Sequence, residues 1–553
     1  MSRFLRFAVD SALGNSGSPA KEYLVGTEVF DRPRDYDPRV DPIVRVEARR
    51  LRAKLKAYYV TLGSQDPICI EFPKGAYTAV FRPREAAAVA QEVAQTAVAV
   101  LPFANLSPQT DDDYFSDGLT EELILLLTRV RGLRVVAWYS ASQFRGREQD
   151  LSSIRENLKA GVILRGSVRR TVGRVRVTAQ LIDTATGSYL WSEAFDRDLS
   201  DVVGIQQEIA RAIVETLRLA WIPAQAAEPP RRKLNVECYN LCLQGRFHAN
   251  SRTQQGLSRS AGCYEQAIET DPKSALAHAG LADAYSLLAD YGIRHPGEVM
   301  PQAESAAQRA LELDPASAEA LSALAFIRSV FDWKWEEAET LYRRAIAINP
   351  SYAKARHWFG VDLLALLGRF DEAEQQVRLA RELDPLSLIL SEGIAYVRML
   401  RTDYQGAIDD FRQVIVLDPA FYKGYSGLGR VFSLMGDYDQ ALAMLEKALS
   451  IAGEVPSIVG ALGQTLALAG KQDQARECLQ KLHAMSQVRH VPSSTFAILH
   501  LGLGEIEPSL EWLERACQQH ESQIVAVKVH PVYDALRPEP RFQSILQHIG
   551  FLP

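Results

Sequence analysis

Apolar and small residues in the second half of the chain follow the spacing of two short amphipathic helices joined by a turn. Gly436 marks the turn, and Ala441, Leu445 and Ala448 lie one helical turn apart on the second helix. Because Gly429 on the first helix and Ala441 on the second are small, the two helices are expected to pack closely there. The residues that mark the first helix are Tyr425, Leu428, Gly429 and Phe432.

The pattern recurs, and a dipeptide of Asp or Asn followed by Pro marks the end of each second helix, because proline cannot continue a helix. Neighbouring prolines of these dipeptides are 43, 35, 35 and 34 residues apart. The long first interval predicts an inserted loop from Asp290 to Pro301. The dipeptides are Asp271-Pro272, Asp314-Pro315, Asn349-Pro350, Asp384-Pro385 and Asp418-Pro419.

A helix–turn–helix unit with this period resembles the tetratricopeptide repeat. The resemblance covers residues 236–517 with about eight units, and residues 518–553 resemble the segment that closes such arrays. It implies an α-solenoid whose first helices line a concave groove that binds a protein or peptide. Alignment of the units places Lys354, Lys423 and Arg430 in this groove, which favours an acidic or C-terminal carboxylate peptide; solvated cations are the alternative.

Near the N-terminus, two short helical patterns precede a long basic helix that begins at Asp41. Four apolar residues of this helix recur at helical spacing and predict its buried stripe, and four cations recur one position further on. An alternating segment, Ile68 to Phe81, predicts a hairpin that turns at Pro73 to Gly75. The apolar residues are Val44, Ala48, Leu51 and Leu55, and the cations are Arg45, Arg49, Arg52 and Lys56.

This order of elements resembles the winged-helix domain of OmpR/PhoB-type response regulators over residues 1–84. The matching residues are Val44-Arg45-Val46, Arg49 to Leu55 and Lys74-Gly75-Ala76-Tyr77. The resemblance implies that the third helix enters the major groove of double-stranded DNA. That family has a small sheet before its first helix, whereas this sequence begins at the helix, so either a trimmed domain or a start upstream is expected.

Charge separates this N-terminal segment from the rest of the chain. Residues 1–84 contain 15 Lys and Arg and 10 Asp and Glu, a net charge of +5, whereas the whole chain carries −6. A basic module on an acidic body is typical of nucleic-acid contact. The alternative is a solvated or protein-binding helix face that pairs with acidic neighbours. Those neighbours are Asp31, Asp35, Asp37 and Asp41.

After a polar linker at residues 85–95, residues 96–222 predict an α/β domain. A strand at Thr96 to Phe103 and a helix from Asp117 are followed by a strand, a short helix, three strands and a closing helix from Asp201 to Leu217. The segments Val100 to Phe103, Tyr114 to Leu123 and Leu190 to Glu193 resemble the TolB N-terminal domain, which implies docking of protein partners. Residues 223–235 predict a second linker.

The remaining observations remove classes of function. The six cysteines form no CxxC pair, the sparse use of cysteine suits a cytoplasmic protein, and no apolar stretch has membrane length. The acidic residues Asp111, Asp112, Asp113 and Asp117 lack the pattern of a calcium loop and predict a solvated helix start rather than a metal site. Phosphate-loop, dinucleotide, metalloprotease and nucleophile-elbow motifs are absent from the sequence, so no cofactor is expected.

The sequence therefore predicts a multidomain α and α/β protein made of a winged-helix-like segment, a TolB-like domain and a tetratricopeptide solenoid. We expect a non-enzymatic adaptor, similar to a transcription regulator, that couples binding of a protein or peptide to DNA contact. The alternative is a scaffold for protein partners that does not bind DNA. The sequence leaves a homo-oligomer open.

Overall fold

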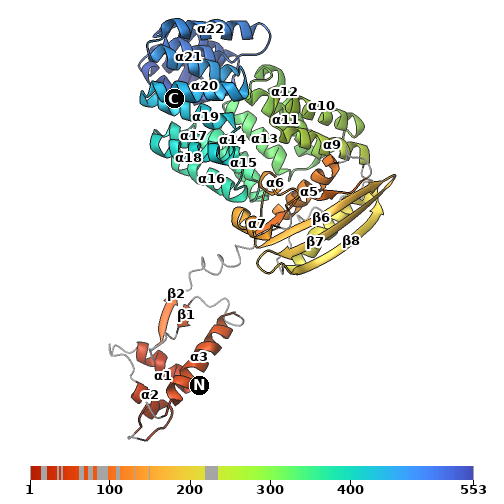
Figure 1. Cartoon of the computed structure of the whole chain (residues 1–553), viewed down its shortest axis with the longest axis vertical. Helices are drawn as coiled ribbons and strands as arrows, with labels where there is room; N and C mark the ends of the chain where they lie inside the picture. Colours follow the sequence, from red (N-terminus) through yellow and green to blue (C-terminus); the bar gives the residue numbers. More distant parts are fainter. Residues whose placement is uncertain are drawn as a thin grey trace. The chain divides into compact units, whose positions relative to one another are not determined.

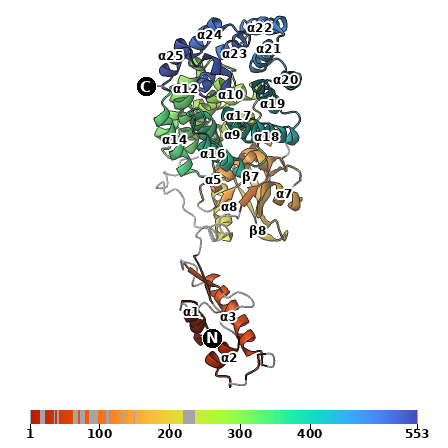
Figure 2. The same cartoon turned by 90° about the vertical axis from the view of Figure 1, so that its left-hand side faces the viewer.

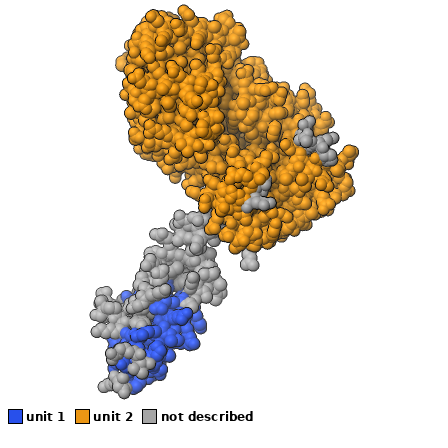
Figure 3. Space-filling model, in the orientation of Figure 1, with its two compact units in different colours: residues 1–95 blue, residues 96–553 orange. Residues whose placement is uncertain are grey.

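The computed structural model of the chain forms two compact units, residues 1–95 and 96–553 (Figure 3). Within them the structure describes residues 2–13, 22–33, 36–38, 41–60, 68–71, 79–83, 97–107, 113–130, 133–147, 150–217 and 235–551. The predicted hairpin turn, the linker at 85–95 and most of the linker at 223–235 lie outside these ranges.

The described residues of the N-terminal unit form three helices and a two-stranded antiparallel sheet. Val44, Ala48 and Leu51 on the third helix are buried against the other two helices, and Leu55 is half-buried, so the predicted stripe is confirmed. In the sheet, Ile68 pairs with Pro83. The elements are α1 (Ser2–Leu13), α2 (Glu22–Val29), α3 (Ile43–Val60), β1 (Ile68–Glu71) and β2 (Val80–Pro83).

The second unit begins with a mixed sheet in the order β5-β3-β6-β7-β8, with β4 beside β6. The helices α5 and α8 cover one face, whereas α7 packs against the end of the other face near Ile163 and Ile182. The predicted strands and helices occur in the predicted order, but the structure adds β4 and α6, and α5 begins at Asp113, before the predicted Asp117. The strands are β3 (Ala97–Val100), β4 (Ala104–Asn105), β5 (Arg134–Val135), β6 (Val162–Thr171), β7 (Arg174–Asp183) and β8 (Tyr189–Asp198). The helices are α5 (Asp113–Thr128), α6 (Trp138–Ser142), α7 (Leu151–Leu158) and α8 (Val202–Thr216).

Antiparallel helix pairs make up the rest of the unit and stack side by side (Figures 1 and 2). The first four pairs are α9 (Val236–Asn250) with α10 (Gln254–Thr270), α11 (Ala275–Asp290) with α12 (Pro296–Leu313), α13 (Ala318–Val330) with α14 (Trp335–Ile348), and α15 (Ala353–Phe359), which continues into the π-helical turn η3 (Gly360–Leu364), with α16 (Phe370–Leu383). The others are α17 (Leu388–Leu400) with α18 (Tyr404–Leu417), α19 (Tyr422–Met435) with α20 (Tyr438–Ala452), α21 (Pro456–Leu468) with α22 (Gln472–Ser486), and α23 (Ser493–Gly502) with α24 (Ile506–Gln518).

The best-patterned pair, α19 with α20, shows the close approach that the small residues predict. A Cβ atom built on Gly429 would lie 2.6 Å from Leu445 and 3.2 Å from the carbonyl oxygen of Ala441. Gly436 ends α19 in the left-handed conformation with φ of 80°, which a glycine adopts without the penalty of a Cβ atom. The residues chosen from the pattern therefore make this helix contact.

The loop predicted between Asp290 and Pro301 is wrong. The helix α11 extends to Asp290 and α12 begins at Pro296, so both Pro296 and Pro301 lie in a helix. Pro296 occupies the first turn of α12, where the missing N–H of proline does no harm. Longer helices, rather than an insertion, account for most of the long interval between the first two dipeptides.

The C-terminal residues pack against repeats far earlier in the sequence. His520 stacks on Trp333 with ring centroids 4.3 Å apart, and Phe551 stacks on Trp335 at 4.8 Å. The Trp335 Nε1 donates to the carbonyl oxygen of Ile549 at 3.0 Å, across 214 positions of sequence. The segment consists of η4 (Ser522–Lys528), η5 (Pro531–Leu536) and α25 (Pro540–His548). It therefore joins the end of the array to its third helix pair, in addition to packing on α24.

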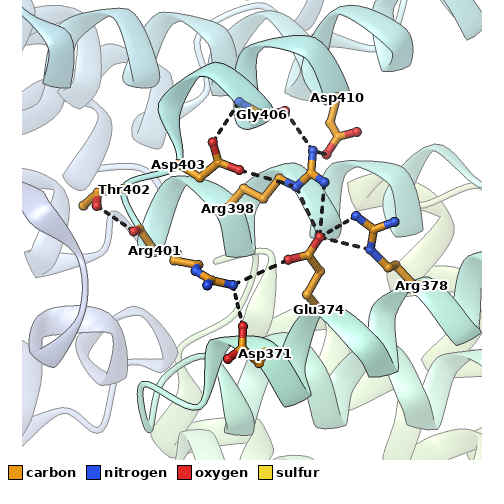
Figure 4. Close-up of polar contacts among 9 residues, drawn as sticks. All are labelled: Asp371, Glu374, Arg378, Arg398, Arg401, Thr402, Asp403, Gly406 and Asp410. Carbon is orange, nitrogen blue, oxygen red and sulfur yellow. Dashed lines mark hydrogen bonds and ion pairs between the residues drawn. The ribbon is translucent and has the colours of Figure 1, made fainter.

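Ion pairs link the helices at regular intervals along the array. Arg328 in α13 pairs with Glu304 of α12 at 2.6 Å. Two periods later, Arg398 in α17 pairs with Glu374 of α16 at 3.2 Å and with Asp410 of α18 at 2.9 Å (Figure 4). Because each arginine binds carboxylates from neighbouring helices, these networks fix the packing of one repeat on the next.

Candidate functional site

A cavity with a volume of about 1650 Å³ lies inside the array. Its wall is formed by the first helices of successive pairs, by α5 and α6 of the sheet domain, and by η4 and η5 of the C-terminal segment. The three cations predicted for the groove, Lys354, Lys423 and Arg430, all line it. The structure thus brings together residues from α15 and α19 at the inner surface that the repeat pattern predicts.

Two of these three cations contact other side chains of the chain. Lys354 forms an ion pair with Asp283 and lies over the ring of Trp358, with Nζ 4.3 Å from the centroid. The Nζ of Lys423 lies 4.6 Å from the ring centroid of Tyr291. Burial lowers the pKa of Lys354 to about 8, although Asp283 acts in the opposite direction. Cation–π contacts of this kind hold an ammonium group in place where water is scarce.

Arg430 is bound less completely than the two lysines. Its Nη2 donates to the carbonyl oxygen of Ser457 at 3.3 Å, whereas its Nε is buried without a hydrogen-bond partner among the described residues. An unpartnered N–H at the wall of a cavity is free to donate to an acceptor on a ligand. Arg430 is therefore the groove cation with the most hydrogen-bonding capacity left.

Three carboxylates that sequence reasoning missed also line the cavity: Asp290, Asp362 and Glu392. All three are half-buried, and burial raises the pKa of each of them. Repulsion from Asp290 and Glu392 raises the pKa of Asp362 further. Counting both signs of charge on the first helices, instead of the cations alone, would have found them.

His357 shares this wall with the carboxylates. Burial, reinforced by nearby cations, lowers its pKa to about 3, so the imidazole is neutral near pH 7. Its Nε2 is buried and has no hydrogen-bond partner within the described part of the chain. His357 therefore lies on a face of α15 that lines the cavity.

The sheet domain reaches the cavity through two contacts with the array, the first between α5 and α9. A Cβ atom on Gly118 of α5 would lie 2.5 Å from Leu243 of α9, so only glycine allows this approach. Beside it, Arg246 of α9 forms an ion pair with Glu122 at 2.6 Å, and Asn250 donates to Glu121 at 2.6 Å. Gly118, Glu121 and Glu122 of α5 thus contribute to the contact between the sheet domain and the array.

The second contact joins α6 to the turn between α16 and α17. The backbone N–H of Ser140 donates to Asp384 at 2.9 Å, and its hydroxyl also donates to this carboxylate. The Ser140 hydroxyl accepts from the N–H of Leu386 at 2.8 Å. In other repeats the equivalent aspartate serves its own turn, as when Asp418 accepts from the N–H of Ala420 at 2.8 Å. Asp384 is instead used to hold the sheet domain.

The cations predicted to contact DNA lie on α3 of the N-terminal unit. The side chains of Arg45 and Arg49 are exposed, that of Arg52 is half-buried, and that of Lys56 lies outside the described residues. Arg45 forms an ion pair with Glu22 of α2 at 2.9 Å. Arg45 therefore has a carboxylate partner from the same unit, but Glu22 is not among the acidic neighbours that the sequence favoured.

A search for metal ligands finds no cluster of three or more His, Cys, Asp or Glu side chains in the ranges that the structure describes. Asp111 and Asp112 lie outside these ranges. Asp117 is buried on α5 and forms an ion pair with Arg145, so it does not lie in the solvated position that its sequence context predicts. Across the described helices, none is both long and apolar enough to cross a membrane.

Comparison with known families agrees with the helix pairs. The sequence model of the tetratricopeptide repeat family matches residues 433–487, which include the turn at Gly436 and the pair α21 with α22. The chain therefore contains tetratricopeptide repeats. Solved structures similar to the chain include the human IFIT1 dimer with m7Gppp-AAAA, at 16% identity and a TM-score of 0.41 over 57% of this chain and 77% of that chain.

The curated relatives of the chain differ in their names. Putative adenylate cyclase 3 of Rhizobium meliloti is 36% identical over 193 residues, 34% of this chain and 32% of the relative. Transcriptional regulator HilA of Salmonella typhimurium is 26% identical over 208 residues, 37% of this chain and 36% of the relative. Anaphase-promoting complex subunit 3 of Schizosaccharomyces pombe is 27% identical over 194 residues, 35% of this chain and 27% of the relative. The chain spans about a third of the length of these relatives.

The first of these relatives corrects one expectation. The sequence led us to expect a protein without enzymatic activity, because the motifs of several enzyme classes are absent. That expectation is wrong, because a relative that is 36% identical to the chain over 193 residues bears the name of an enzyme. Motif searches detect only active sites whose residues lie close together in sequence, so the absence of those motifs was a weak argument.

Proposed function

We propose that the chain is a regulatory adaptor whose cavity binds a segment of a partner protein and whose N-terminal unit contacts DNA. The cavity of about 1650 Å³ carries the first half of this proposal. Sites for small ligands measure roughly 300–1,000 Å³, so a cavity of this size fits a polypeptide segment better. Lys354, Lys423 and Arg430 are the proposed contacts from the array.

Peptide binding by the intact chain tests this role. A library of peptides is first screened for binding to the intact chain. To locate the bound peptides, Val361 in the cavity wall is replaced by a photo-crosslinking amino acid, and crosslinking to the peptide is measured. The control carries the same amino acid at Glu446, which is exposed on α20 and does not line the cavity. Crosslinking from residue 361 alone supports the proposal. Equal crosslinking from both positions, or no peptide binding, rejects it.

For the N-terminal unit we propose a winged-helix-like role in which Arg45, Arg49, Arg52 and Lys56 meet DNA. Three helices followed by a two-stranded antiparallel sheet support it, as does the similarity of the chain to a protein named as a transcriptional regulator. DNA contacts by arginine and lysine release counterions, so affinity is expected to fall steeply with salt. Each lost phosphate contact reduces the slope of log affinity against log salt by about one.

The DNA proposal is tested by the double substitution Arg49→Ala with Arg52→Ala in the intact chain. We expect it to abolish filter binding of double-stranded DNA at low salt while leaving the thermal unfolding of the protein unchanged. Arg50→Ala is the matched control, because Arg50 lies on the same helix and forms an ion pair with Glu47 at 2.7 Å. Equal binding by all three proteins would favour the scaffold interpretation.

We further propose that the sheet domain is TolB-like and couples the two activities. Its support is the order of strands and helices, together with its contacts with the array through Arg246 and Asp384. A domain held at two points moves with the array when a ligand changes the array. Substituting Ser140→Ala removes the hydroxyl contact with Asp384 and tests whether peptide binding still alters DNA binding.

A second candidate function is nucleotide cyclisation, and the observation that favours it is the name of the relative from Rhizobium meliloti. Incubation of the intact chain with ATP and Mg²⁺ or Mn²⁺, followed by detection of cyclic AMP, tests it. Product above that of a heat-denatured control supports this candidate, and its absence under both metals counts against it.

A further inference from the structure

The charge balance of the cavity differs from that expected for a site that binds acidic peptides. Among the described residues that line it, ten are Asp or Glu and six are Lys or Arg, so the wall carries a formal net charge of −4. An excess of one sign in a cleft attracts ligands of the other sign. The balance therefore favours a cationic ligand.

The local contacts point in the same direction. Lys354 forms an ion pair with Asp283. Lys423 lies over the ring of Tyr291 and attracts the carboxylates of Glu392 and Asp290, so both ammonium groups are already engaged within the chain. In contrast, the structure gives the side chains of Asp290, Asp362 and Glu392 no hydrogen bond or ion pair within the described residues. The three carboxylates lie on three different first helices, which are α11, α15 with η3, and α17.

A separate polar group lies beside these carboxylates. Ser522 is only 6% exposed, lines the cavity, and its hydroxyl has no hydrogen-bond partner among the described residues. The next residue, Gln523, donates from Nε2 to the carbonyl oxygen of Asp290 at 3.2 Å, which places Ser522 near Asp290. A buried hydroxyl without a partner is costly, and a ligand donor or acceptor at this point would satisfy it.

The backbone at Asp362 is also unusual. Asp362 lies in η3, where α15 continues as a π-helical turn. Single π-helical turns within α-helices are frequent at functional sites. The turn begins at Gly360, where a Cβ atom would lie 2.6 Å from Val377 and 2.9 Å from the carbonyl oxygen of Ala373. The turn therefore packs closely against α16 just before Asp362.

We propose that the cavity binds a basic segment of a partner protein and seats a lysine or arginine side chain between Asp290, Asp362 and Glu392, with Ser522 as an additional acceptor. This inference rests on the proposed peptide-binding function and names its ligand class. It reverses the preference for acidic peptides that the three groove cations predict. Guanidinium and ammonium groups donate charge-assisted hydrogen bonds to carboxylates, which are stronger than neutral ones.

The test measures binding of fluorescent peptides to the intact chain by anisotropy at 0.15 M salt. Three probes of equal length are rich in lysine and arginine, in glutamate and aspartate, or in serine and glycine. We expect the basic probe to bind at least about tenfold more tightly than the acidic probe, which corresponds to 1.4 kcal/mol or more. Equal or tighter binding of the acidic probe overturns the inference.

Two substitutions separate the roles of charge and fold. Asp362→Asn with Glu392→Gln should weaken the basic probe about tenfold or more, because each keeps the size of the side chain and removes its charge. Lys423→Met should act in the opposite direction and strengthen the basic probe, because it removes a like charge. The control, Asp439→Asn with Glu446→Gln, alters two exposed carboxylates of α20 outside the cavity and should leave binding unchanged.

The outcomes also distinguish this inference from the function on which it rests. Binding of neutral or acidic probes that crosslinks from residue 361 retains the peptide-binding cavity and rejects the basic ligand. Failure of every probe to bind rejects both proposals. Loss of basic-probe binding in the control double variant, to the same extent as in the cavity variant, would show that the net charge of the protein acts and not the three carboxylates.

Discussion

Charged residues of the array fall into two regions that differ in their partners. In the contact between α16, α17 and α18, Arg398 pairs with Glu374 and Asp410, and all three side chains are mostly buried (Figure 4). In the cavity, Asp290 and Asp362 are also half-buried, yet within the described residues neither side chain has a hydrogen bond or ion pair. The same fold therefore contains carboxylates with cationic partners and carboxylates without them.

The difference between paired and unpaired carboxylates indicates which charged residues stabilise the fold. A partly buried carboxylate without a partner lowers stability, because it has lost water and gained no compensating interaction. Such groups persist where another function requires them. Asp384 lies between these two cases. It is buried, and among the described residues its carboxylate accepts hydrogen bonds only from the neutral donors of Ser140. The effect of removing a charge should therefore fall from Arg398 through Asp384 to Asp362.

The largest effect is expected from Arg398→Ala. The substitution leaves Glu374 and Asp410 close together without their shared cation, and loss of one partner of a buried pair is strongly destabilising. Since the Arg398 side chain is 21% exposed, solvent reduces the effect, and we expect the free energy of unfolding to fall by about 2–4 kcal/mol. Urea unfolding of the intact protein, followed by circular dichroism, measures it.

Arg378→Ala is the matched control for this substitution. Arg378 also binds Glu374, at 2.6 Å, but its side chain is 47% exposed. Exposed ion pairs contribute only about 0–1 kcal/mol, so this variant should unfold nearly as the parent does. Equal losses of stability in the two variants would show that the contribution of an arginine to stability does not depend on its burial or on its number of carboxylate partners.

How far the sequence predicts these regions depends on the distance between the residues involved. Contacts within one repeat, such as that of Gly429 with Leu445, follow from apolar spacing and were predicted. The contact of Trp335 with Ile549 spans 214 positions and depends on how far each helix pair rotates from the previous one, which no local pattern encodes. Asp384 was recognised only as a repeat landmark, because its partner Ser140 belongs to another domain.

The cavity was predicted in part for the same reason. Repeat alignment correctly placed Lys354 and Lys423 on the inner surface, since their positions follow from the period. Asp283 lies two helix pairs before Lys354, and Tyr291 lies four helix pairs before Lys423, so the alignment did not show that the lysines are already engaged. Position within a repeat was thus predictable, whereas the charge that remains available to a ligand was not.

An effect of intermediate size is expected from Asp384→Asn, and it depends on pH. Burial raises the pKa of Asp384 from 3.8 to about 6, so the carboxyl binds its proton more tightly in the folded chain. The stabilisation that this group contributes is complete below the pKa that it has in the unfolded chain. It is lost as pH rises through the higher pKa that it has in the folded chain. The asparagine oxygen still accepts from Ser140 but does not ionise. The variant should therefore gain about 1–3 kcal/mol over the parent between pH 5 and pH 7.5.

Thermal unfolding of both proteins at several pH values measures this gain. Asp418→Asn is the control, because Asp418 accepts from the N–H of Ala420 within its own exposed turn. The difference between Asp418→Asn and the parent gives the effect of replacing a carboxylate in a repeat turn that has no contact with Ser140. A difference between Asp384→Asn and the parent that stays constant from pH 5 to pH 7.5 would show that Asp384 does not titrate there.

The smallest effect, with the opposite sign to that of Arg398→Ala, is expected from Asp362→Asn. Burial raises the pKa of Asp362 and repulsion from Asp290 and Glu392 adds to this, so removing the charge relieves an unfavourable interaction in the folded chain. Because the side chain is half-buried and partly screened, the gain in the free energy of unfolding at pH 7.5 should be only about 0.5–1 kcal/mol.

Urea unfolding with and without a basic peptide measures both the stability of the Asp362→Asn variant alone and its stabilisation by the ligand. The variant should be slightly more stable alone and gain less from the peptide than the parent, since ligand stabilisation grows with affinity. A clear loss of stability without peptide would instead place Asp362 with Arg398, among the charges that hold the fold together.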